Sequence, residues 1–270
     1  MKSGGTFINR RTDKTLQHLV HSFYYQEFNR NVASNSGLIA DDGCYEIMFV
    51  KETDAFLSYG INNRSKIPHT YTINRVPQPF SIDFKACFTT FCIKLQPWNN
   101  GMFFPNSLPQ GILDLRTLFG KEILDLHENI FSSKSFNEMV TLAEQFLIAK
   151  EYCLSAEMEF VKSVCEKIYD CKGSVSVNEL AETFDVPRQI LNKIFFRHVK
   201  HTVKKFLVLI RMRASIEYKL ANPTSSFTEI AYKFGYSDQA HFVNDFRKVC
   251  GVTPSMFVKT PSYSCNDLRR

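Results

Sequence analysis

The sequence predicts an α+β protein: an N-terminal antiparallel β-barrel with trailing helices, then an all-helical part. Three observations support this prediction. Short runs of β-branched and aromatic residues, interrupted by prolines, fill residues 1–110. The apolar residues take up a helical period from about Leu113 onward. A pattern of capped helices then occurs twice near the C-terminal end. A chain of 270 residues has room for two domains, which we place at 1–150 and 155–265.

The strand-like runs begin after a turn signal at Asp41-Asp42-Gly43. They cover residues 44–50, 56–59, 70–76 and 81–95. A set of short antiparallel strands of this kind is typical of a small barrel or sandwich.

Two apolar patterns follow at helical spacing. The first covers residues 118–126. The second is a continuous seam made of Phe136, Met139, Val140, Ala143, Phe146 and Leu147. Two interpretations of this seam stay open. It packs on the barrel of its own chain, or it forms a coiled-coil-like contact between two copies.

The repeated pattern covers residues 176–186 and 226–236. Each copy starts with a Ser-x-x-Glu capping box, in which both side chains satisfy backbone N–H groups at a helix start. Each then places an aliphatic residue, an Ala and a Phe on one face. Each ends at a residue that tolerates a left-handed turn, Asp185 in the first copy and Gly235 in the second.

A second helix follows each turn, from Pro187 to about Val199 and from Asp238 to about Val249. The pattern therefore predicts two helix-turn-helix motifs, whose second helices are the elements that enter the DNA major groove. A joining helix from about Thr202 to Ala221, stopped by Asn222-Pro223, would hold them ~34 Å apart, about one DNA turn.

The second copy continues with Ile230-Ala231, Gly235-Tyr236, Asp238, His241-Phe242, Phe246-Arg247-Lys248, Gly251 and Thr253-Pro254. In these residues the chain resembles the AraC/XylS family of bacterial transcription regulators, over roughly residues 160–260. Three positions depart from the family pattern: Asp185 replaces a usual Gly, Asn244 a common Arg, and Phe257-Val258 an aromatic-Arg pair. Residues 24–25, 41–49 and 94–97 resemble the cupin-like sensor-type domain that precedes such modules.

The resemblance implies a sequence-specific DNA-binding transcription regulator, and it names base-reading positions. These are Gln189, Asn192 and Lys193. In the second helix of the second copy, the apolar Phe242 and Phe246 should face inward, which leaves Gln239, His241 and Asn244 toward the groove. Asn and Gln pair bidentately with adenine, and Lys with guanine acceptors. The candidate phosphate contacts are Arg188, Lys204, Lys205, Arg247 and Lys248. For each, a solvated surface side chain or an internal ion pair is the alternative.

The charge distribution agrees with this function. Residues 161–270 hold 18 Lys and Arg against 10 Asp and Glu, a net charge of +8, whereas residues 1–160 have a net charge of −2. Binding to phosphates requires such a basic surface. The competing functions are a small-molecule-binding barrel and a protein-interaction module whose helical repeats dock a protein partner.

An enzyme is not expected. The histidines at 18, 21, 69 and 127 are scattered and show no metal-ligand spacing, and there is no nucleophile elbow, phosphate loop or dinucleotide fingerprint. We expect no metal and no cofactor.

The sequence contains no apolar stretch long enough for a membrane span and no apolar signal core. We therefore expect a cytoplasmic protein with reduced cysteines and no membrane partner. Double-stranded operator DNA is the expected partner. RNA polymerase, a small-molecule effector and a second copy of the chain are further candidates.

Overall fold

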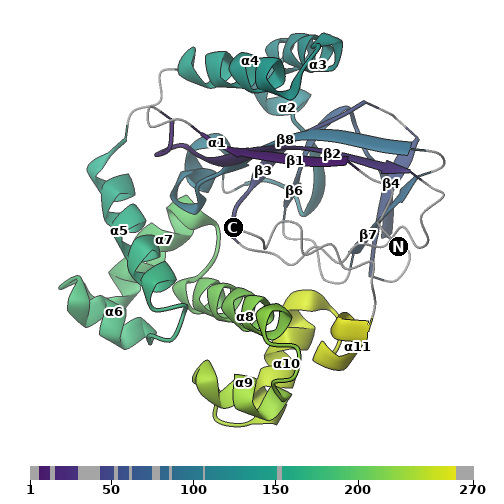
Figure 1. Cartoon of the computed structure of the whole chain (residues 1–270). Coiled ribbons are helices and arrows are strands. Elements are labelled where there is room, and N and C mark those ends of the chain that lie inside the picture. Colours follow the sequence, from purple (N-terminus) through teal and green to yellow (C-terminus); the bar gives the residue numbers. More distant parts are fainter. Residues whose placement is uncertain are drawn as a thin grey trace. The chain divides into compact units, whose positions relative to one another are not determined.

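The chain forms two units, and each is assembled from separate segments (Figure 1). Unit 1 comprises residues 1–36, 44–96 and 107–154, and unit 2 comprises residues 37–43, 97–106 and 155–270. The computed structural model describes residues 6–12, 16–29, 43–51, 54–60, 63–74, 80–84, 87–105, 107–150 and 154–259.

Unit 1 is built on antiparallel strands that form two sheets. The first sheet has the order β1-β2-β8-β3-β6-β9, and the second has the order β5-β4-β7. The strands of the first sheet are β1 (Thr6–Arg11), β2 (Val20–Asn29), β3 (Glu46–Val50), β6 (Thr70–Asn74), β8 (Cys87–Leu95) and β9 (Gly111–Asp114). The second sheet contains β4 (Ala55–Tyr59), β5 (Asn63–Lys66) and β7 (Phe80–Phe84). The predicted α+β class, with antiparallel strands ahead of helices, is confirmed.

The predicted barrel, however, is not closed among the described residues. Closure requires a continuous ring of paired strands, whereas β1 and β9 lie at opposite edges of the first sheet. The run 81–95 supplies strands to both sheets, because β7 pairs with β4 while β8 pairs with β2 and β3. Leu113, where the helical period was predicted to begin, lies in β9. Strand-forming residues predict a strand but not its pairing partner.

Three helices complete unit 1: α2 (Arg116–Phe119), α3 (Glu122–Ser132) and α4 (Phe136–Ile148). The predicted stripe over residues 118–126 is broken at Gly120, whose positive φ of 62° ends α2. Helices α3 and α4 lie side by side against the first sheet (Figure 1).

The apolar seam of α4 packs within unit 1. Val140, Ala143 and Leu147 are fully buried. The ring of Phe136 lies 6.1 Å from that of Phe91 in β8, centroid to centroid. For these residues the interpretation in which the seam packs on its own chain is confirmed.

Unit 2 consists of helices. The long ones are α5 (Ala156–Asp170), α7 (Arg188–Val199), α8 (Val203–Ala221) and α10 (Gln239–Cys250). The short ones are η1 (Pro97–Asn99), α1 (Asn100–Phe103), α6 (Val177–Thr183), α9 (Phe227–Lys233) and α11 (Pro254–Lys259). Both predicted second helices and the joining helix are thus present. None of the helices in the described parts of the chain has the length and apolar character that crossing a membrane requires.

Helix α8 contributes side chains to two separate cores. Val203, Phe206, Leu207 and Ile210 pack with residues of α5, α6 and α7. Leu209, Met212 and Ile216 pack with residues of α9, α10 and α11. Figure 1 shows α8 between these two groups of helices. One helix therefore contributes to the cores of both predicted motifs.

The segment formed by η1 and α1 belongs to the first of these cores, although it follows β8 in the chain. Trp98 is buried in the cluster that includes Phe195 and Phe206. The fully buried Asn100 donates its amide to the carbonyl of Val199, the last residue of α7, at 3.0 Å. This bond satisfies one of the carbonyls that a helix leaves unpaired at its C-terminal end.

Gly101 determines how closely this segment approaches α7. A Cβ atom at this position would lie 2.2 Å from the carbonyl oxygen of Arg197. We therefore expect Gly101→Ala to push α1 away from α7 and to lower the free energy of unfolding by about 1–3 kcal/mol, as overpacking does. Urea denaturation of the full chain measures the loss, and amide hydrogen exchange should locate it in α7.

Gly120→Ala is the control, since a Cβ at Gly120 would meet no atom within 4 Å and its backbone strain falls in unit 1. Unchanged exchange in α7 of the Gly101→Ala protein would contradict the prediction.

Candidate nucleic-acid interface

The first motif consists of α6, a turn and α7. In its capping box, Ser176 Oγ accepts the Glu179 N–H at 3.1 Å and Glu179 Oε2 accepts the Ser176 N–H at 2.7 Å. Asp185 has a φ of 49°, so the predicted left-handed turn residue is confirmed. The Val186 N–H then donates to the carbonyl of Ala181 at 3.0 Å, which closes the turn.

The second motif, built from α9 and α10, repeats this geometry. Ser226 and Glu229 form the same capping box, with distances of 3.1 and 2.7 Å. Gly235 has a φ of 74°, and the Tyr236 N–H donates to the carbonyl of Ala231 at 2.9 Å. The repetition seen in the sequence is therefore a repetition of hydrogen bonds.

The two turns differ in length by one residue. Pro187 alone separates Val186 from α7, whereas Ser237 and Asp238 separate Tyr236 from α10. Asp238 is the N-cap of α10, and its Oδ1 accepts the His241 N–H at 2.7 Å. The longer second turn therefore gives α10 a polar cap that α7 lacks.

The first residue of each second helix is tied to the helix before it. Arg188 Nη1 donates to Asn178 Oδ1 of α6 at 3.5 Å, and Thr228 Oγ1 of α9 donates to Gln239 Oε1 at 2.7 Å. Asn178 and Thr228 occupy the same place in the two repeats. The sequence analysis did not single them out, although comparison of the two copies could have paired them.

The outer face of α7 presents Gln189 and Lys193, both exposed. Leu191 and Phe195 are buried on the opposite side. Asn192 is half-buried, and its amide donates to the carbonyl of Arg188 at 3.0 Å. Of the three base-reading candidates on α7, the structure therefore places two on the open face and one at its edge.

The outer face of α10 presents Ala240 and Asn244, both exposed, while Phe242 and Phe246 are buried. Counted from the buried Leu191 and Phe242, Ala240 is equivalent to Gln189 and Asn244 to Lys193. The open face of α10 is therefore smaller and uncharged at these positions.

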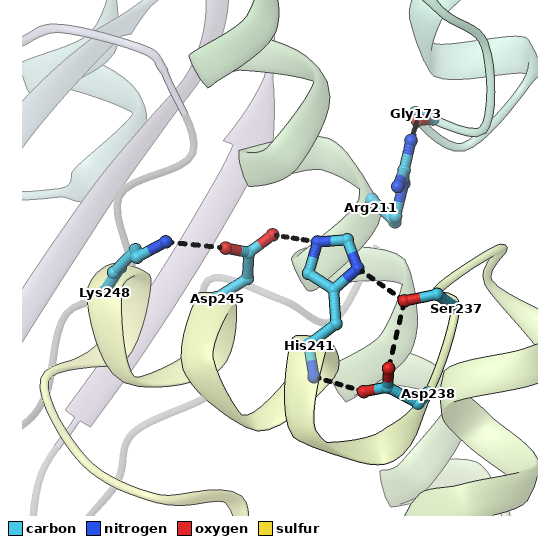
Figure 2. Close-up of polar contacts among 7 residues, drawn as sticks. All are labelled: Gly173, Arg211, Ser237, Asp238, His241, Asp245 and Lys248. Carbon is cyan, nitrogen blue, oxygen red and sulfur yellow. Dashed lines mark hydrogen bonds and ion pairs between the residues drawn. The ribbon is translucent and has the colours of Figure 1, made fainter.

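His241 is engaged by its own motif on both ring nitrogens (Figure 2). Its Nδ1 lies 3.2 Å from Ser237 Oγ, and its Nε2 lies 3.5 Å from Asp245 Oδ2. The buried Asp245 also pairs with Lys248, at 3.2 Å between Nζ and Oδ1. This network holds the His241 ring and the Lys248 side chain along the outer side of α10.

Comparison with known proteins agrees with this geometry. Residues 180–260 match a family model described as a helix-turn-helix domain, of the AraC type. The Msm operon regulatory protein of Streptococcus mutans is 29% identical over 139 residues, 51% of this chain and 50% of that protein. Residues 180–260 therefore form a helix-turn-helix domain of the AraC type.

The chain spans about half the length of the Streptococcus protein. It is also 29% identical, over 86 residues, to an uncharacterized HTH-type transcriptional regulator of Haemophilus influenzae, and this match covers 28% of that protein. ToxT from Vibrio cholerae has a TM-score of 0.45 at 13% identity, covering 95% of this chain and 98% of ToxT. The C-terminal domain of AraT from Geobacillus stearothermophilus has a TM-score of 0.34 at 23% identity, covering 39% and 86%.

The structure separates the cations of unit 2 into internal and exposed ones, which the sequence could not do. Arg211 donates to the carbonyl of Gly173, and Arg213 Nε pairs with Glu217 at 3.0 Å. Lys200 is buried at the end of α7. All five predicted phosphate contacts have exposed side chains: Arg188, Lys204, Lys205, Arg247 and Lys248. Nowhere in the described residues do three His, Cys, Asp or Glu side chains gather as a metal site.

Three carboxylates in the family motifs have pKa values below their ordinary range. Hydrogen bonds from Ser176 lower the pKa of Glu179, and those from Ser226 lower that of Glu229. The backbone N–H of His241 lowers the pKa of Asp238, with smaller contributions from Ser237 and others. All three groups accept helix-start N–H bonds more strongly as carboxylates than as neutral carboxyl groups, so their ionisation is coupled to folding.

Unit 2 is therefore expected to lose stability in acid. Because folding depresses these pKa values, the unfolded chain binds more protons, and the stabilisation is complete above the unfolded value and lost as the pH falls through the folded one. For Glu179 and Glu229 the loss begins near the ordinary value of 4.5. Thermal unfolding followed by circular dichroism should give a midpoint that falls with pH below this value.

A triple variant, Glu179→Gln, Glu229→Gln and Asp238→Asn, keeps capping side chains but removes the titrating groups. Its midpoint should depend less on pH in the same range. An identical pH dependence of the two proteins would show that the caps are not the coupled groups.

Proposed function

We propose that unit 2 binds duplex DNA sequence-specifically, with α7 and α10 entering successive major-groove segments on one face of the duplex. The observation that carries this proposal is the pair of helix-turn-helix motifs with matching capping boxes and left-handed turn residues, joined by one helix that belongs to both cores. A major groove admits one α-helix, and groove segments on one face recur every ~34 Å. The compartment in which a regulator of this kind meets operator DNA is the cytoplasm.

The charge of unit 2 supports a polyanionic partner. The net charge of residues 161–270 is +8. Lys204 and Lys205 are exposed at the start of α8, and Arg247 is exposed on α10. We assign these side chains to phosphate oxygens, because they lie beside the second helices and their charge carries no sequence information.

Base reading is assigned first to Gln189 and Lys193. Both are exposed on one face of α7, and Lys pairs with guanine acceptors while Gln pairs bidentately with adenine. On α10 we assign base reading to Asn244 and Gln239, the latter after release from Thr228. Asn192 would need to leave the Arg188 carbonyl to reach a base, and His241 keeps its partners Ser237 and Asp245. We therefore propose His241 as a support for α10 rather than as a base reader.

The test uses the full chain, because Trp98 and Asn100 belong to the core beneath α7 and a fragment starting near residue 155 lacks them. A random duplex library selected with the protein supplies the DNA. We expect one enriched sequence, bound with an affinity that falls steeply as salt rises. The slope of log K against log salt is about −0.9 for each phosphate neutralised. A flat salt response, or no enriched sequence, would exclude the proposed function.

The two second helices should contribute unequally to affinity. Lys193→Ala on α7 removes a cationic base contact and should cost ~1–3 kcal/mol of specific binding. Asn244→Ala at the equivalent position of α10 should cost less, since that face is smaller. Each variant is titrated against the selected duplex and against duplexes mutated in either half.

Lys167→Ala on the exposed surface of α5 is the charge-matched control and should leave affinity nearly unchanged. Equal losses from Lys193→Ala and Asn244→Ala, or a Lys193→Ala loss that is uniform across DNA sequences, would contradict this ranking.

A further inference from the structure

Arg211 lies in the stretch of α8 where side chains of the two cores alternate, with Leu209 already packed in the second core. Ile210, immediately before it, packs in the core of the first motif, and Met212, immediately after it, packs in the core of the second. Arg211 itself is half-buried. Its position therefore gives one side chain access to both motifs.

The guanidinium of Arg211 uses this access. Nε and Nη2 donate to the carbonyl oxygen of Gly173 at 3.0 and 2.6 Å (Figure 2), and Gly173 lies in the turn that leads into α6. The guanidinium carbon lies 5.4 Å from the ring centroid of Tyr236, in the turn between α9 and α10. One cation thus contacts a backbone turn of the first motif and an aromatic ring of the second.

The two contacts lead to different helices, one to α10 of the second motif and one to α6 of the first. The buried Tyr236 packs edge-to-face on Phe242 of α10, with ring centroids 5.4 Å apart. Gly173 precedes the capping Ser176 of α6. A displacement of the Arg211 side chain would therefore loosen the anchoring of both turns against α8.

Gly173 permits this contact because it has no side chain. Its φ is +70°, and a Cβ atom there would lie 2.4 Å from the carbonyl oxygen of Leu207 and 2.8 Å from the Arg211 nitrogen, both in α8. The turn consequently approaches the α8 backbone closely enough for its carbonyl to accept two bonds. The planar fork of Arg suits such a paired contact and an aromatic face, whereas the compact ammonium of Lys does not reproduce it.

We propose that Arg211 is a positioning residue that sets the distance and orientation between the two recognition helices, and with them the spacing of the two half-sites. This inference rests on the proposed function. It assigns to Arg211 no contact with DNA, because its donors are turned toward Gly173.

The experiment measures affinity of the full chain as a function of half-site spacing. The probes are the selected duplex, versions with one or two base pairs inserted or removed between the half-sites, and versions with one half-site scrambled. The wild-type chain should prefer one spacing. Arg211→Lys and Arg211→Met should bind the optimal duplex about tenfold more weakly, ~1.4 kcal/mol, and should lose most of the preference among spacings. Their binding to single half-sites should stay close to wild type.

Arg213→Met is the matched control, because it removes an Arg from the same helix whose ion-pair partner, Glu217, lies one turn away on α8 itself. It should keep the wild-type spacing preference. If thermal unfolding shows that Arg211→Met does not fold, Arg211→Lys decides the question.

The outcomes are distinguishable from failure of the proposed function. Absence of specific binding by the wild-type chain would remove the proposed function and this inference together. Specific wild-type binding with an unchanged spacing preference in Arg211→Lys would overturn the role of Arg211 alone. An equal loss of preference in Arg213→Met would also overturn it, because the effect would then come from α8 in general.

Discussion

The arrangement of both helix-turn-helix motifs depends on the burial of one helix, α8, in two separate cores. Val203, Phe206, Leu207 and Ile210 pack with α5, α6 and α7, whereas Leu209, Met212 and Ile216 pack with α9, α10 and α11. Each fully buried aliphatic or aromatic side chain contributes about 1.5–3 kcal/mol. Removing either set of side chains from its core would therefore cost several kcal/mol of stability, and both motifs are held against the same helix.

Some polar side chains in unit 2 are hydrogen-bonded or ion-paired within the protein, and others are exposed to solvent. Ser176, Ser226 and Asp238 satisfy N–H groups at helix starts, and Asp245 holds His241 and Lys248. Gln189 and Lys193 remain exposed on α7. For a helix-turn-helix domain this division matters, because a side chain already bonded within the protein must give up a partner before it can read a base.

Unit 2 also draws on a part of the chain that lies far from it in the sequence. Trp98 fills the first core, and Asn100 bonds the last carbonyl of α7. The chain leaves β8 at Leu95 and reaches this segment two residues later. A strand of unit 1 and the support of α7 are thus covalent neighbours. Unit 2 is consequently not a contiguous stretch of sequence.

The sequence by itself determined the local features. Capping boxes, the left-handed residues Asp185 and Gly235, and the ends of α8 follow from short-range hydrogen bonding and sterics, which neighbouring residues specify. It did not determine which sheet a strand joins, as the split of residues 81–95 between two sheets shows, nor that Trp98 belongs to unit 2. Only the tertiary structure decided that Arg211 bonds to a backbone carbonyl of unit 2 and that Lys193 is exposed to solvent. The physical reason is that a charged side chain takes its role from the groups that folding brings within a few ångströms, and these lie far away in the chain.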